Sequence, residues 1–292
     1  MDAKTAIGRH ARRLREQQKL TQDQVAAKTG ISYQFLSGLE NGRENFSVDV
    51  LESLAKALGT PLPQLIAGAF SGGTAAIPVV NSAHFRPQVP LPPRLTTSHI
   101  EAAVNATQSL FARINANLIS SGGKPLVKYI QGNNFSGIVS NILCDSFHEH
   151  SPYRHNSHQA YPDLINAKAK NAGLEVKSTI KIGKGGESHN GHSGWHLVAC
   201  FTIDPTTGNI RFVHLMFAVI NGHTEAHPDW KYVGSTENAE TGSRRTETYN
   251  TNRYGMTKLR DGSVFLDPAA IKFIRWKTQR RGAVPSYSIF HK

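Results

Sequence analysis

The first seventy residues carry apolar side chains at helical spacing. Ile7, Ala11 and Leu14 recur at intervals of four and three residues, which predicts a helix with one buried face. Thr21 and Gln24 form a capping-box pattern, in which each side chain bonds the backbone N–H of the other residue. A second helix is therefore expected to begin at this point.

Further helices are predicted in the same segment. Gly30 suits the left-handed turn that ends a helix, and Ser32 is placed to cap the next one. Apolar residues between positions 50 and 58 mark a fourth helix, and a short fifth helix follows Pro61. The pattern indicates an all-α first domain.

Residues 71–98 separate this domain, residues 1–70, from the rest of the chain. They contain Gly72, Gly73 and five prolines, which disfavour regular structure and make part of the segment a semi-rigid spacer. We therefore predict a linker, followed by a second domain at residues 99–292.

The second domain begins with helices and continues with strands. Ser98 and Glu101 form another capping-box pattern, and the apolar spacing predicts a long helix to about Leu118 and another near 135–148. Strands are expected at 160–166, 174–182, 195–203 and 210–220. A polar loop and a closing helix are expected at 234–253 and 268–276. This order predicts an α/β domain with a mixed central sheet.

The charge of the chain favours an acidic partner. The 292 residues carry a formal net charge of +12, which is typical of proteins that bind polyanions. No run of about 18 apolar residues occurs, so a membrane partner is not expected. The two cysteines are too few for a disulfide framework and, without a signal segment, indicate a reducing cytoplasm.

The positive charge is unevenly distributed. Residues 1–70 hold nine basic and seven acidic side chains, a net of +2, so the remaining +10 lies in residues 71–292. No acidic residue follows Asp267, whereas Lys272, Arg275, Lys277, Arg280, Arg281 and Lys292 do. This excess favours a second domain that meets nucleic acid, although a solubilising tail would have the same composition.

The string LTQDQVAAKTGISYQFLSGLENGR resembles the helix-turn-helix of the Cro/repressor-type family, also called the XRE family. The resemblance covers roughly residues 4–68 and implies a recognition helix at 32–39 that lies in a major groove of DNA. It implies DNA contacts from Gln22, Ser32, Tyr33, Gln34, Ser37 and Arg43. A glutamine amide can bond adenine through two hydrogen bonds, which suits Gln34 to reading a base. Use of such a domain for protein contacts is the alternative.

The segment YPDLINAKAKNAGLEVKST carries the candidate chemistry of the second domain. Glu175 and Lys177 lie two residues apart on a predicted strand, so their side chains share one face. A hairpin-like connection would bring Asp163 beside them. Two carboxylates and the Val176 carbonyl are hard oxygen ligands that suit Mg²⁺, and a lysine there could orient the attacking water.

This PD-x11-ExK spacing resembles the PD-(D/E)xK nuclease superfamily, the restriction-endonuclease-like fold. The resemblance implies Asp163 and Glu175 as metal ligands and Lys177 as the catalytic lysine. It also implies a supporting acid on the preceding helix, for which Asp145 and Glu149 are the candidates. A solvated strand that happens to carry a glutamate and a lysine is the alternative interpretation.

Histidines are numerous, with 14 in the chain. The loop that follows the candidate catalytic strand contains His189 and His192, which we expect to contact the phosphates of a nucleic acid. No HExxH zinc-peptidase motif occurs, and an HNH-type nuclease built on these histidines remains a second nuclease alternative.

Together these features predict a sequence-specific, Mg²⁺-dependent DNA endonuclease of the type II restriction class. Its helix-turn-helix domain would position the enzyme on DNA or regulate its own promoter. Two-fold symmetric sites favour a homodimer, and a restriction enzyme implies a cognate DNA methyltransferase as partner. The alternative is a non-enzymatic transcriptional regulator of the XRE family with a C-terminal sensing or oligomerisation domain.

Overall fold

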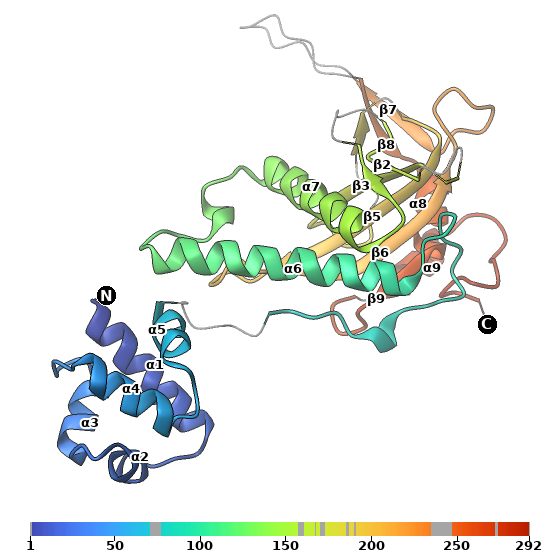
Figure 1. The fold of residues 1–292 in the computed structure, drawn as a ribbon. Coiled ribbons are helices and arrows are strands. Elements are labelled where there is room, and N and C mark those ends of the chain that lie inside the picture. The colour runs from blue at the N-terminus through green and yellow to red at the C-terminus, as the bar shows by residue number, and fades with distance from the viewer. Residues whose placement is uncertain are drawn as a thin grey trace, which may run out of the picture. The chain divides into compact units, whose positions relative to one another are not determined.

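The computed structural model describes residues 2–70, 77–156, 161–166, 168–169, 173–184, 187–189, 191–234, 247–271 and 274–291. The chain forms two compact units (Figure 1). The first comprises 1–76 with 113–125, and the second comprises 77–112 with 126–292. Within the described ranges, no helix combines the length and the apolar character needed to cross a bilayer.

Residues 2–70 form a bundle of short helices, as predicted. The helices are α1 (Ala3–Gln17), α2 (Gln22–Thr29), α3 (Tyr33–Glu40), α4 (Val48–Ala57) and α5 (Leu62–Phe70). The capping box of Thr21 and Gln24 is present, and Ser32 caps α3 by accepting from the N–H of Phe35. Gly30 ends α2 with φ at 73°, in the left-handed region that favours glycine.

Two long helices follow in the chain, α6 (Thr97–Ser120), whose residues 97–112 belong to the second unit, and α7 (Gly132–His150), together with the short 3-10 helices η1 (Ser82–His84) and η2 (Leu126–Lys128). The start of α6 differs from the prediction. The hydroxyl of Thr96, not that of Ser98, accepts the cap hydrogen bond, from the N–H of His99 at 3.3 Å. Glu101 instead accepts from Ser82 at 2.5 Å, so a tertiary contact replaces the expected capping box.

A six-stranded mixed sheet lies at the centre of this unit, in the order β1-β2-β3-β5-β6-β9. Its strands are β1 (Arg154–His155), β2 (Leu164–Ile165), β3 (Gly173–Thr179), β5 (Gly194–Ile203), β6 (Ile210–Ile220) and β9 (Ser263–Leu266). β3 and β5 are parallel, and the other neighbours are antiparallel. The predicted α/β class with a mixed sheet is therefore confirmed.

A second, three-stranded sheet has the order β4-β8-β7, built from β4 (Glu187–His189), β8 (Thr248–Thr251) and β7 (Trp230–Gly234). The prediction of a loop over 234–253 was wrong at β8, because pairing with two distant strands makes this polar segment extended. Residues 235–246 of that predicted loop lie outside the described residues.

The end of the chain also differs from the prediction. Helix α8 (Arg253–Asp261) precedes β9, and the last helix, α9, spans Ile274–Gln279. The predicted helix at 268–276 is wrong in its first part: the described residues from Pro268 to Ala270 form a turn. The carboxylate of Asp267 accepts from the N–H of Ala269 in that turn, and its other contact is with Arg211 at 2.9 Å.

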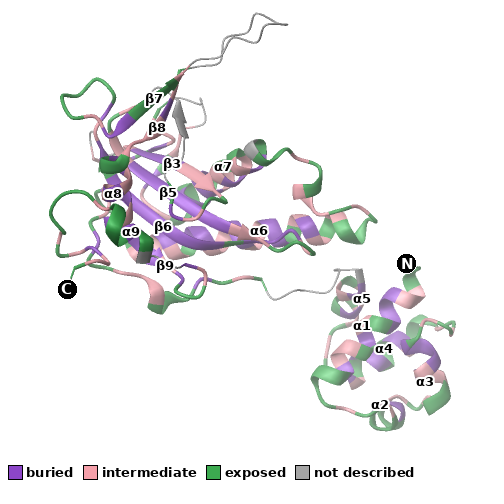
Figure 2. Cartoon of the chain, turned by 180° about the vertical axis from the view of Figure 1, so that it is seen from behind, coloured by how far each residue is buried: buried purple, intermediate pink, exposed green. Residues whose placement is uncertain are grey.

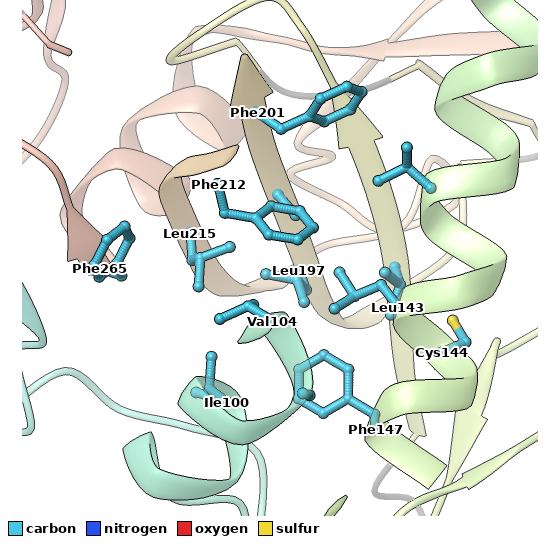
Figure 3. Packing of buried hydrophobic residues seen from close by; sticks show 14 of the residues in the cluster. Ile100, Val104, Leu143, Cys144, Phe147, Leu197, Phe201, Phe212, Leu215 and Phe265 are labelled. Carbon is cyan, nitrogen blue, oxygen red and sulfur yellow. The ribbon is translucent and has the colours of Figure 1, made fainter. Parts of the chain in front are cut away.

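The central sheet has two different faces. Figure 3 shows apolar side chains of one sheet face packed against apolar side chains of α6 and α7. The sheet contributes Leu197 and Phe201 of β5 and Phe212 and Leu215 of β6, and the helices contribute Ile100, Val104, Leu143 and Phe147. On the other face, Val198, Met216 and Ala218 pack in a separate cluster with Trp230 and Leu259. Because both faces are covered, β5 and β6 are buried along most of their length (Figure 2).

Residues 77–96, within the predicted linker, pack on the second unit. The N–H of Val80 donates to Asn105 of α6 at 3.0 Å, and the N–H of Arg86 donates to the carbonyl of Val264 in β9 at 2.8 Å. Val80, Val89 and Leu95 are buried in its apolar core. These contacts attach the segment to the second unit, whereas residues 71–76 lie outside the described residues.

Candidate functional site

Helix α3 presents polar and aromatic side chains to solvent. Tyr33 is 47% exposed, Gln34 is exposed and Ser37 is half-buried, whereas Leu36 and Leu39 are buried in the core. The buried pair holds the helix against the bundle and leaves its opposite face accessible. The residues that were expected to contact bases are therefore available on one surface.

A buried ion pair anchors the end of α3. Arg15 of α1 bonds both carboxylate oxygens of Glu40, at 2.6 and 2.8 Å, and both side chains are almost fully buried. The Arg15 guanidinium also donates to the carbonyl of Leu20. Hydrogen bonding to Glu40, only partly opposed by burial, raises the pKa of Arg15. The pair connects α1, α3 and the turn before α2.

Gln22, expected to touch a phosphate, has a partner within the domain. Its amide donates to Glu40 at 2.7 Å, which holds the start of α2 next to the end of α3. Gln22 lines a shallow polar depression of about 470 Å³ together with Arg12, Arg15, Thr21, Asp23, Tyr33, Ser37 and Asn41. Ser32 is committed to capping α3, and Arg43 is exposed.

In the second unit, the structure brings Asp163, Glu175 and Lys177 together. Asp163 directly precedes β2, and Glu175 and Lys177 share one face of β3. An oxygen of Asp163 accepts a hydrogen bond from the N–H of Val176 at 2.8 Å. The ammonium of Lys177 contacts Glu175 Oε1 at 2.6 Å. Antiparallel pairing of β2 with β3 produces this arrangement, as the sequence predicted.

The charges of this cluster are poorly compensated. Glu175 is 7% exposed, and its Oε2 atom is buried with no hydrogen-bond donor in the part of the chain that the structure describes. Burial and the neighbouring Glu175 carboxylate raise the pKa of Asp163. Burial disfavours the ammonium of Lys177, but the carboxylates of Glu175 and Asp163 outweigh it and raise its pKa. The two buried carboxylates are thus balanced by a single positive charge, that of the Lys177 ammonium. Their remaining negative charge favours the binding of a second cation.

The donor set fits a hard divalent cation. The orphaned Glu175 Oε2, the Asp163 carboxylate and the carbonyl of Val176 are oxygen donors, and Mg²⁺ uses a few such protein oxygens together with several waters. Among the described residues, no group of three or more His, Cys, Asp and Glu side chains could hold a metal. The donors named at this site are oxygens, the ligand type that Mg²⁺ uses, whereas structural Zn²⁺ sites use mainly nitrogen and sulfur.

The acids of α7 lie apart from this cluster. Asp145 pairs with His155 of β1 at 2.6 Å, and its side chain is 67% exposed. Glu149 is 75% exposed and lies 4.0 Å from His150. The α7 side chain near the carboxylates is the buried Cys144, whose pKa burial raises first and Asp163 raises further. The structure thus does not place Asp145 or Glu149 with Asp163.

Aromatic and histidine rings form a wall beside the carboxylates, which the sequence did not predict. Tyr161 stacks on His192 with ring centroids 4.1 Å apart, and His196 packs edge-on against Trp230 at 5.4 Å. Burial, with Glu175 and Asp163 nearby, raises the pKa of Tyr161 to about 12. The sequence signal that could have indicated this wall was the aromatic residue before Pro162. The side chain of His189, an expected DNA contact, lies outside what the structure describes.

The basic C-terminal segment divides into two groups. Arg280 bonds both carboxylate oxygens of Asp261, and this pair is buried, so Arg280 ties the tail to α8. Arg275, Lys277 and Arg281 are exposed. The exposed group remains available to an acidic partner, whereas Arg280 stabilises the fold.

Comparisons with known proteins concern the first unit. Residues 12–65 match the family model described as helix-turn-helix. An uncharacterized HTH-type transcriptional regulator, y4dJ, of Sinorhizobium fredii is 44% identical over 66 residues, covering 23% of this chain and 86% of the relative. The immunity repressor protein of Bacillus phage phi105 is 35% identical over 60 residues, covering 20% of this chain and 42% of the relative.

A solved structure is similar over the same fraction of the chain. The clp gene regulator ClgR from C. glutamicum is 29% identical, with a TM-score of 0.24, and the match covers 26% of this chain and 97% of that one. The family match begins inside α1 and ends inside α5, so it spans the bundle that carries Tyr33 and Gln34. Through residues 12–65, the chain belongs to the helix-turn-helix family, with a domain of the XRE/Cro type.

Proposed function

We propose that the protein binds double-stranded DNA through α3 and hydrolyses DNA phosphodiester bonds at Asp163, Glu175 and Lys177. The observation that carries the nuclease proposal is the buried Glu175 Oε2, which has no donor among the described residues and lies near the Asp163 carboxylate. A buried carboxylate oxygen without a partner is costly, and a bound cation would remove that cost. The helix-turn-helix domain supports DNA as the substrate, since such domains place their second helix in a major groove.

Each side chain has a distinct part in the reaction. Asp163 and Glu175 hold a divalent cation, which when bound neutralises phosphate charge and lowers the pKa of a water. Lys177, an ammonium at neutral pH, donates to a phosphate oxygen as negative charge develops on it. The water oxygen bonds to phosphorus and one ester P–O bond breaks, while the proton that the attacking water releases is taken up by the leaving oxygen.

The distribution of charge supports the same reaction. The first domain has a net charge of +2, so its contacts alone supply little electrostatic attraction to DNA. Residues 71–292 carry +10, and Arg275, Lys277 and Arg281 are exposed. Binding of residues 71–292 to the phosphate backbone would give this excess a role, and a homodimer would double it on a two-fold symmetric site.

The test is cleavage of plasmid and phage DNA by the full chain, with Mg²⁺ or with EDTA. We expect cleavage only with Mg²⁺, and its loss in Asp163→Ala, Glu175→Ala and Lys177→Ala while DNA binding persists. Glu149→Ala is the matched control, because this carboxylate is 75% exposed and lies outside the cluster. Normal cleavage by the Glu175→Ala variant would refute the site.

The products distinguish the kinds of nuclease. Discrete fragments indicate a restriction-type enzyme, for which a cognate methyltransferase is the expected partner. A smear of fragments indicates a degradative or repair nuclease. No cleavage of any substrate, with a stable footprint in the presence of Mg²⁺, rejects the nuclease proposal.

The second candidate is a non-enzymatic transcriptional regulator. The names of the matched relatives, a transcriptional regulator and an immunity repressor, favour it. Those matches cover only 20–23% of this chain, so they support DNA binding by the first unit and do not extend to the sheet that carries Asp163. A footprint on the protein's own promoter that represses a reporter without cleavage would establish this function.

A further inference from the structure

His196 of β5 lies beside the candidate catalytic strand. β3 and β5 are parallel, and Glu175 is the register partner of His196. Partner residues on neighbouring strands point to the same face of the sheet, so the imidazole and the Glu175 carboxylate share a face. Residue 197, the next along β5, packs in the opposite core with α6 and α7. The charges of Lys177 and Asp163 both act on the His196 ring.

The hydrogen bonds of His196 define its tautomer. Its Nδ1 atom lies 2.9 Å from the carbonyl oxygen of Gly194, and a carbonyl only accepts, so Nδ1 carries the proton. The Nε2 atom then presents a lone pair. His196 is 2% exposed, and this Nε2 atom is buried with no partner among the described residues. An acceptor therefore points into the protein without a donor.

The surroundings hold this ring in one position. Three successive carbonyls, of His192, Ser193 and Gly194, each accept a hydrogen bond from a ring: Trp230 Nε1–H, the Tyr161 hydroxyl and His196 Nδ1–H respectively. Trp230 also packs against the His196 ring, and the Tyr161 ring lies 6.5 Å from it. The wall is rigid, so the direction of the Nε2 lone pair is set before any ligand binds.

Resting on the proposed function, we propose that His196 positions the attacking water by accepting a hydrogen bond from it at Nε2. Direct metal ligation does not fit, since Asp163, Glu175 and His196 do not form a three-ligand group among the described side chains. Lys177 cannot take this role, because its ammonium has no lone pair. A water held by Nε2 would lie on the sheet face that carries Glu175 and Lys177.

His214 provides a matched comparison. It lies on the same face of the sheet, on β6, and its Nδ1 atom is also buried without a partner. Its Nε2–H donates to the hydroxyl of Ser263, which itself donates to the carbonyl of Arg260, and its ring stacks on Trp276. His214 is thus a buried histidine remote from the carboxylates, and its substitution measures the purely structural effect.

The experiment uses the full chain and plasmid DNA that the wild type cuts. Single-turnover cleavage and DNA affinity in Ca²⁺ are measured for His196→Phe, His196→Gln and His214→Gln. We expect His196→Phe to lower the cleavage rate on the order of 100-fold with DNA affinity unchanged. The glutamine oxygen can accept in place of Nε2, so His196→Gln recovers part of the rate. His214→Gln loses stability and keeps its rate per folded molecule.

The possible failures are distinguishable. If the wild type cuts and His196→Phe cuts equally fast, the His196 proposal is wrong and the nuclease proposal stands. If the wild type cuts nothing, both are wrong. Thermal unfolding with Ca²⁺ or EDTA gives a readout that does not depend on catalysis. His196→Phe should keep the rise in unfolding midpoint that Ca²⁺ causes in the wild type. If the variant loses this rise, His196 is a metal ligand and the water-positioning proposal is wrong.

Discussion

Asp163 and Glu175 place two carboxylates in one buried site, where Asp163 accepts from the N–H of Val176 at 2.8 Å and Glu175 Oε2 has no donor within the described ranges. The neighbouring negative charge and burial raise the pKa of Asp163, so its ionised form is disfavoured in the metal-free fold. From this relationship we expect divalent cations to stabilise the second unit.

We expect Ca²⁺ or Mg²⁺ to raise the free energy of unfolding of the second unit by about 2.7 kcal/mol at a hundredfold excess over the dissociation constant. Tryptophan fluorescence measures this, because Trp195, Trp230 and Trp276 all lie in that unit. Asp163→Asn keeps an acceptor for Val176 and removes one charge, so this variant should be more stable in EDTA and insensitive to cations. An equal cation response of Asp163→Asn and the wild type would contradict the metal site.

Gln34→Ala should weaken site-specific DNA binding by about 1–3 kcal/mol, because a side-chain amide on the exposed face of α3 can bond a base through two hydrogen bonds. Non-specific affinity should change little. The measurement is a titration of the selected site and of a scrambled duplex by fluorescence anisotropy. Gln64→Ala, an exposed glutamine on α5, is the control. Equal losses on both duplexes would remove Gln34 from base reading.

Glu40→Ala should destabilise the first unit by about 3–5 kcal/mol, because it leaves the buried guanidinium of Arg15 without its carboxylate. Hydrogen exchange of peptides from α1 to α3 reports this unit separately from the tryptophans. Arg12→Ala is the control: it breaks an ion pair with Glu16 in which both side chains are 53% exposed, and it should cost much less stability than Glu40→Ala. Similar hydrogen exchange in both variants would show that the buried Arg15–Glu40 pair stabilises the first unit no more than the exposed pair does.

Acid should destabilise the second unit through His214. Burial lowers the pKa of this histidine from 6.5 to about 3, so between these values the unfolded chain binds a proton that the folded chain does not. The contribution of His214 to the free energy of unfolding is therefore fully present above pH 6.5. It falls as the pH drops below that value, by at most about 1.4 kcal/mol per pH unit.

Urea unfolding of the wild type and His214→Gln at pH 7.5, 6, 5 and 4.5 checks this dependence. The variant should be less stable at pH 7.5 yet show a shallower decline toward acid. His227→Gln, which alters an exposed histidine, should decline as the wild type does. Parallel curves for His214→Gln and the wild type would mean that His214 does not contribute to acid sensitivity.

The helices of the first unit could be predicted because their signals are local. Thr21, Gln24, Gly30 and Ser32 act on backbone groups within a few residues, and all four have the predicted role. The strand β8 could not be predicted, since its polar residues become extended only by pairing with β4 and β7. The cap of α6 moved from Ser98 to Thr96 because Glu101 bonds Ser82, which lies 19 residues away.

The sequence by itself determined the helix-turn-helix bundle and the placement of Glu175 and Lys177 on one face of a strand, because periodicity and capping act over a few residues. Only the tertiary structure decided that His196 lies beside Glu175 and that Glu40 engages both Arg15 and Gln22. Parallel pairing and the burial of charge depend on which distant segments cover each other. That choice depends on apolar burial and strand pairing over the whole fold, and no single stretch of sequence records it.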